Sequence, residues 1–103
     1  MTEDAPNLYR VLYSKLVQAV LAEFTARAAE AGRRDSFLHS VKELDRLLGL
    51  YPQFGEPETD LKNEPGQVYN GTVPPLVVRY AVFEDRRLVF VGSPPRLLPN
   101  AGF

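Results

Sequence analysis

Arg79 interrupts an otherwise apolar stretch of this sequence, Leu76-Val77-Val78-Arg79-Tyr80-Ala81-Val82-Phe83. An arginine held at a fixed place can supply positive charge where negative charge develops, which is what phosphoryl chemistry requires. The same residue also suits a solvent-facing position on a sheet that is covered on one side only. Arg79 is therefore either a candidate site residue or an ordinary surface residue.

The other residues that could do chemistry give weaker signals. His39 is the single histidine, and no serine or aspartate pattern around it indicates a catalytic triad. Acidic residues alternate at Glu56, Glu58 and Asp60, but without convergent ligands elsewhere they indicate a solvated loop or edge. The absence of cysteine excludes a disulfide framework and thiolate metal sites. We expect neither a metal nor a cofactor.

Composition indicates an ordinary globular domain and argues against a dedicated nucleic-acid binder. The chain has 103 residues, of which 45% are hydrophobic and 24% charged, with a net charge of -1. Proteins whose main partner is nucleic acid are usually strongly basic, because phosphate neutralisation supplies most of the affinity. Tyrosines could stack on bases, although packing between strands explains them more simply. The tyrosines in question are Tyr9, Tyr13, Tyr69 and Tyr80.

The first part of the chain predicts a strand and an amphipathic helix. Residues 8–13 are rich in β-branched and aromatic types and are short enough for a strand. Ser14 is a good N-cap for a helix over 15–31, because its hydroxyl can accept a hydrogen bond from an amide of the first turn. Gly32 suits the left-handed position just beyond the helix.

A second helix is predicted over 36–48, with Asp35 as its N-cap and with Gly49 and Pro52 marking its end. The short link between the helices forces them antiparallel. Both helices have an apolar stripe, and each stripe needs a sheet to cover it. The pattern therefore predicts a helical hairpin packed on a sheet.

The sheet is expected to come mainly from the second half. Residues 67–73 are a candidate strand, although Asn70-Gly71 could instead form a tight turn. Residues 76–83 and 87–91 are predicted to form a hairpin around the turn at 84–86. Alternation along the first of these strands predicts that one set of side chains faces the helices: Leu76, Val78, Tyr80 and Val82. Pro94-Pro95 is expected to end the last strand.

The predicted fold is α+β, in the order β-α-α-β-β-β, with the helical hairpin on one face of a small antiparallel sheet. We expect a single domain over residues 1–103, with flexible tails at 1–7 and 99–103. The acidic start Met1-Thr2-Glu3-Asp4 is unlike a signal peptide, and no apolar run reaches the ~20 residues of a membrane span. A cytoplasmic protein is expected.

This order of elements, ending in a tight hairpin, resembles the RelE/ParE superfamily of type II toxin–antitoxin systems. The stretch Leu61-Lys62-Asn63-Glu64-Pro65-Gly66 resembles the beginning of the family's second strand. Arg79-Tyr80-Ala81-Val82, an acidic turn and Leu88-Val89-Phe90-Val91 resemble its central hairpin. The similarity covers residues 8–98 in the order of the elements and residues 61–92 in the amino-acid sequence itself.

The resemblance implies a candidate catalytic set. Members that cleave RNA on the ribosome stabilise the phosphate with lysines and arginines on the concave sheet face, and a tyrosine often assists. The matching or nearby residues here are Arg79, Arg96, Lys62 and Tyr80. The sequence departs from the family pattern in two ways, because 68–72 contains no lysine and Val77 stands where the family has an arginine. We therefore expect weak or absent ribonuclease activity.

The resemblance also implies partners. A toxin of this kind would form a complex with a small antitoxin and would act on ribosome-bound message or on gyrase. Two alternatives remain at this stage: a catalytically silent interaction module of the same fold, and an unrelated small α+β structural domain.

Overall fold

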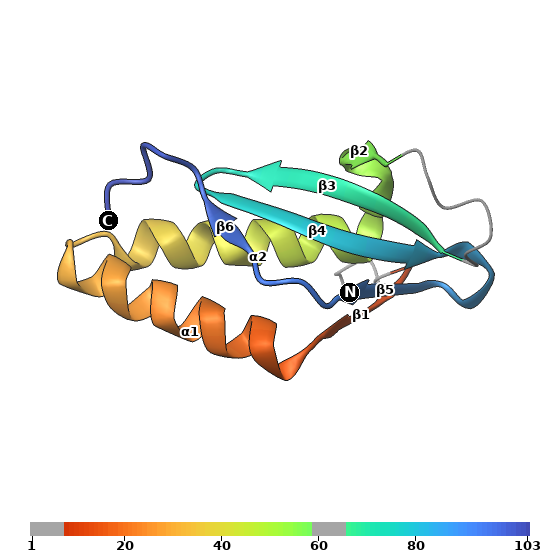
Figure 1. The fold of residues 1–103 in the computed structure, drawn as a ribbon, viewed down its shortest axis with the longest axis horizontal. Helices are drawn as coiled ribbons and strands as arrows, with labels where there is room; N and C mark the ends of the chain where they lie inside the picture. Colours follow the sequence, from red (N-terminus) through yellow and green to blue (C-terminus); the bar gives the residue numbers. More distant parts are fainter. Residues whose placement is uncertain (1–7, 59–65) are drawn as a thin grey trace, which may run out of the picture.

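The computed structural model describes residues 8–58 and 66–103. Two helices pack against one six-stranded sheet (Figure 1), which confirms the predicted α+β fold. The elements, in chain order, are β1 (Arg10–Tyr13), α1 (Lys15–Glu30), α2 (Arg34–Leu50), η1 (Pro52–Phe54), β2 (Glu56–Pro57), β3 (Gln67–Val73), β4 (Leu76–Phe83), η2 (Glu84–Arg86), β5 (Leu88–Val91) and β6 (Arg96–Leu97).

The sheet has the strand order β1-β5-β4-β3-β2, and β6 pairs with β4 beyond the end of β5. Asn70-Gly71 lies inside β3 and does not form a turn, since β3 pairs with β4 along its whole length. All pairs are antiparallel except β1 with β5, which is parallel and departs from the wholly antiparallel sheet we expected. The reason is that the turn after β4 sends β5 back in the direction in which β1 runs.

Helix α1 begins at the predicted residue and ends at Glu30, one residue before the predicted end. The Ser14 hydroxyl accepts a hydrogen bond from the Val17 amide at 3.1 Å, which makes Ser14 the N-cap. At the other end, Gly32 has a φ of 72°, in the left-handed region that favours glycine.

Helix α2 differs from the prediction at both ends. It begins at Arg34 with Arg33 as a cap that makes no side-chain hydrogen bond, so the assignment of Asp35 as N-cap was wrong. It also runs through Gly49 to Leu50, so Gly49 does not end it. The Gly49 carbonyl accepts a hydrogen bond from the Tyr9 amide at 2.9 Å, which satisfies one of the carbonyls in the last turn of the helix.

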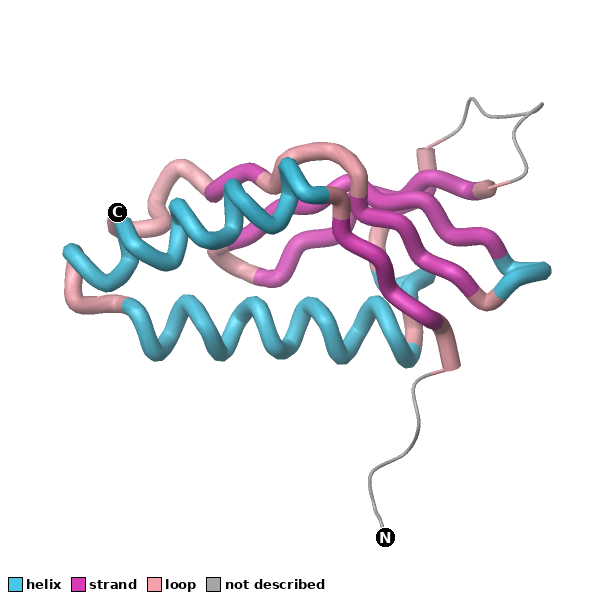
Figure 2. Tube along the Cα trace, turned by 90° about the horizontal axis from the view of Figure 1, so that it is seen from below, coloured by secondary structure: helices cyan, strands magenta, loops and turns pink. Residues whose placement is uncertain are grey.

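The core lies between the sheet and the helical hairpin. The predicted inward set of β4 is buried, from Leu76 to Val82. Helix α2 contacts the sheet at β1 and β3, and α1 lies beside α2, as Figures 1 and 2 show. Leu44 and Val78 are buried, whereas Phe24 is only partly buried and packs edge-on against Phe37 with ring centroids 6.5 Å apart.

The C-terminal part returns to the body of the protein. Strand β5 ends at Val91, before Pro94-Pro95, and the prolines do not end the sheet, because the short strand β6 follows them and pairs with the beginning of β4. In the segment 99–103, expected as a tail, the Phe103 ring packs edge-on against Phe37 at a centroid distance of 5.5 Å. Residues 1–7 lie outside the described part.

Candidate functional site

The face of the sheet that points away from the core is the candidate site, and we call it the open face. Strand register defines it, because cross-strand partners share a face. Asn70 is the partner of Arg79, and Phe90 is the partner of both Ala81 and Leu12. The open face comprises Arg10, Leu12, Glu56, Val68, Asn70, Thr72, Val77, Arg79, Ala81, Phe83, Leu88, Phe90 and Arg96.

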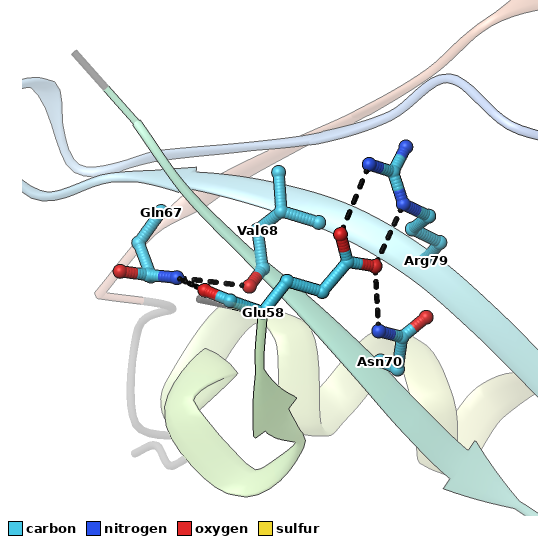
Figure 3. A network of polar contacts seen from close by, with 5 residues as sticks. All are labelled: Glu58, Gln67, Val68, Asn70 and Arg79. Carbon is cyan, nitrogen blue, oxygen red and sulfur yellow. Dashed lines mark hydrogen bonds and ion pairs between the residues drawn. The ribbon is translucent and has the colours of Figure 1, made fainter. Parts of the chain in front are cut away.

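Arg79 is held by an acidic residue on this face. Its Nε and Nη2 atoms donate hydrogen bonds of 2.8 and 3.2 Å to the two carboxylate oxygens of Glu58. The Asn70 side-chain amide donates a third hydrogen bond, of 2.7 Å, to the same carboxylate. Figure 3 shows the Glu58 carboxylate between Arg79 and Asn70.

The pairing changes the electrostatics of both groups. The hydrogen bonds from Arg79 and, next, from Asn70 lower the pKa of the Glu58 carboxyl below its usual value. The same contact raises the pKa of Arg79. Glu58 is therefore ionised at neutral pH, and its charge balances that of the only cation on β4.

The backbone of Glu58 is fixed as firmly as its carboxylate. Its amide donates to the Val68 carbonyl at 2.8 Å, and its carbonyl accepts from the Gln67 side chain at 2.7 Å. The bond between Glu58 and Val68 extends the pairing of β2 with β3 by one residue. The edge of the sheet thus positions the Glu58 carboxylate next to Arg79.

Tyr80 lies on the other face of β4, away from Arg79. It is 2% exposed, and its hydroxyl donates a hydrogen bond of 2.6 Å to the Pro52 carbonyl. The rings of Phe54 and Tyr69 stack on it at centroid distances of 6.0 and 5.8 Å. Burial raises the pKa of its phenol. The structure therefore does not bring Tyr80 together with the candidate arginines.

The remaining two candidates have different outcomes. Arg96 is exposed on β6 and is the cross-strand partner of Val77, so it shares the open face with Arg79. Val77 and Arg79 are two residues apart, which is about 7 Å along a strand. Lys62 lies outside the described residues.

Sequence reasoning missed two members of the site. Glu58 was assigned to a solvated loop or edge, and Asn70 to a strand or a turn. The alternating acids at 56–60 were a signal of an edge strand, but the register that joins Glu58 to Arg79 could not be derived from it. Beside Arg79 the open face has a hollow of about 310 Å³ lined by Val68, Arg79, Tyr80, Ala81, Phe90, Gly92 and Ser93.

A second polar cluster lies where β1, η1 and the β4–β5 turn meet. The Tyr9 hydroxyl donates to Glu84 at 2.6 Å and accepts from the Gln53 amide at 3.1 Å, while Gln53 also donates to Glu84. The Arg87 guanidinium lies over the Tyr9 ring, 5.6 Å from its centroid. These polar groups bond one another, so the cluster has a structural role: it joins the three segments.

Within residues 8–58 and 66–103, no group of three or more acidic or histidine side chains is placed to hold a metal ion. None of the helices in the described part is long and apolar enough to cross a membrane. Comparison of the chain with protein-family models and with curated proteins gives no match.

Proposed function

We propose that this chain is a RelE/ParE-like component of a type II toxin–antitoxin system that acts by binding a protein partner, with RNA cleavage weak or lost. The order strand, helix, helix and then strands with a tight hairpin, which carries the resemblance, supports the family. The observation that carries the rest is the contact between Arg79 and Glu58. A small antitoxin is the proposed partner, and the lack of cysteine suits a reducing cytoplasm.

The geometry argues against RNA cleavage. Phosphoryl chemistry needs cations preorganised where negative charge develops. The charge of Arg79 is already balanced by Glu58, and the Tyr80 hydroxyl is bonded inside the core. Of the candidate residues in the described part, Arg96 remains, and with Arg10 on the same face it is a poor match for the cluster that cleaving members use.

The same face suits protein binding. Leu12 and Phe90 are cross-strand partners that are 43% and 42% exposed, and the less exposed Ala81 lies next to them. Contiguous apolar surface rimmed by polar groups marks protein interaction sites. Arg10 and Arg79 lie beside these apolar side chains, and arginine is enriched in protein interfaces.

The first test is binding. The chain is expressed with the product of any short reading frame adjacent to its gene, and we expect the two to copurify. Phe90→Glu should weaken this complex at least tenfold, because it places a charge in the apolar part of the open face. Tyr51→Glu is the control, since Tyr51 is also exposed but follows α2. Equal binding by both variants would remove the open face from the interface.

The second test is chemistry. Wild type and Arg79→Ala are induced in cells, and message integrity is followed on a gel. We expect intact message in both cultures. Cleavage that depends on Arg79 would instead support a ribosome-dependent nuclease.

A further inference from the structure

Arg79 and Asn70 form a three-donor cradle for one carboxylate. Two of the donors belong to the arginine fork and the third to the amide, and all three bond the Glu58 carboxylate at 2.7–3.2 Å. A planar group with two oxygens matches the arginine fork, whose paired hydrogen bonds give strength and direction. The cradle is therefore a binding site for a carboxylate, and a side chain of the same chain fills it.

This occupant can be exchanged at small cost. The side chains of Arg79 and Glu58 are 49% and 33% exposed, so solvent reaches the pair. Exposed ion pairs contribute little free energy, because water screens the charges and two long side chains lose freedom. Competition from Glu58 would lower the apparent affinity of the site for another carboxylate only about two- to fivefold.

Glu58 is nevertheless kept next to the cradle. Its amide and carbonyl are bonded to Val68 and Gln67, so its backbone stays in place when its carboxylate is displaced. It would return to Arg79 when the competitor leaves. This is the behaviour of an intrachain competitor.

The surroundings favour a carboxylate from a protein over a phosphate from RNA. The hollow beside Arg79 is lined largely by apolar side chains, among them Val68, Ala81 and Phe90. RNA affinity grows with the number of phosphates neutralised. Of the described residues on the open face, only Arg10 and Arg96 add further positive charge.

We propose that Arg79 and Asn70 form a carboxylate-binding site on the open face, and that Glu58 fills it until an acidic side chain of a partner protein, flanked by apolar ones, replaces it. This inference rests on the proposed protein-binding function and names the chemistry of the partner.

The direct test follows the Arg79 Nε–H resonance by NMR while sodium acetate replaces sodium chloride at constant ionic strength. Glu58→Gln should lower the acetate concentration at the midpoint of the titration about two- to fivefold relative to wild type. Glu56→Gln is the matched control, because Glu56 lies two residues earlier on the same edge strand and has no ion pair with the described residues. An equal midpoint in the two variants would overturn the proposal.

The second arm replaces acetate with inorganic phosphate and then with single-stranded RNA. A response of Arg79 to phosphate or RNA at concentrations where acetate gives none would also overturn it. Arg79→Lys keeps the charge but removes the fork, so it should lose the preference for a fluorescent Glu/Leu peptide over its Gln/Leu counterpart. An unchanged preference would count against the cradle, and backbone amide spectra establish that each variant is folded.

The two hypotheses can fail separately. If the copurifying partner binds wild type and Glu58→Gln equally while Phe90→Glu prevents binding, the competitor role fails and the proposed function stands. If no partner is found but Glu58→Gln still lowers the acetate midpoint, the carboxylate site stands and the proposed function fails.

Discussion

The Tyr80 hydroxyl donates a hydrogen bond of 2.6 Å to the Pro52 carbonyl, which joins the middle of β4 to the segment that follows α2. Tyr80→Phe would leave this carbonyl buried without its partner. We expect the free energy of unfolding to fall by about 1–3 kcal/mol, measured by urea denaturation. Tyr69→Phe is the control, because the Tyr69 hydroxyl has no hydrogen bond to the described residues, and it should change stability much less. Equal losses would refute the role of the bond.

Gly71 leaves room for the aromatic ring of Phe54. A Cβ atom at position 71 would lie 2.7 Å from Phe54 Cζ and 3.1 Å from Tyr80 Cε1, which is too close for both rings to stay in place. Gly71→Ala should therefore destabilise the protein by about 1–3 kcal/mol through overpacking. Thr72→Ala, at the next and exposed position, is the comparison. A thermal melt that ranks Thr72→Ala as the more damaging change would contradict this packing.

Phe37 is the central aromatic residue of the helical layer. It is 1% exposed and has Phe24 and Phe103 packed edge-on against it. Phe37→Ala should lower the free energy of unfolding by about 3–5 kcal/mol. Phe24→Ala should lower it by about 1–3 kcal/mol, because Phe24 is only half-buried. Denaturation of the two variants side by side checks the order. The reverse order would mean that Phe24 is the better buried ring.

Because of Glu84, the free energy of unfolding should depend on pH in the acid range. Hydrogen bonds from Tyr9 and Gln53 lower the pKa of its carboxyl. A lowered folded-state pKa gives stability that is present above the unfolded value of about 4.3 and is lost as pH falls through the folded value. Tyr9→Phe removes the first of these bonds, so the pKa of Glu84 should rise towards its ordinary value.

Carbon-13 NMR of the Glu84 carboxyl measures this shift directly. The stability gap between wild type and Tyr9→Phe should also be smaller at pH 3 than at pH 6, because the fraction of protonated Glu84 grows as the pH falls. A gap of constant size would show that the bond does not distinguish the two protonation states.

The features predicted best from the sequence are those that depend on neighbouring residues. Ser14 and Gly32 act at the ends of one helix, and each does so through its own backbone or hydroxyl. The alternation of β4 likewise reports its two faces without reference to other elements. These signals are local, so the sequence contains them in full.

The features that were missed depend on contacts between distant segments. Helix α2 continues through Gly49 to Leu50, and the Gly49 carbonyl is bonded by the distant Tyr9 amide. Glu58 meets Arg79 only through the successive registers of β2, β3 and β4. Residue types state what a side chain can do, and register decides which partner it meets.

The parallel pairing of β1 with β5 has a consequence for biosynthesis. Arg10 pairs with Leu88, so the first strand finds its ladder only after nearly the whole described sheet has left the ribosome. At ~5–20 residues per second, this interval is about 4–16 s. During that time the apolar sides of α1 and α2 can pack against each other, but no complete sheet covers them. A nascent chain of this protein is therefore a candidate for chaperone binding until β5 emerges.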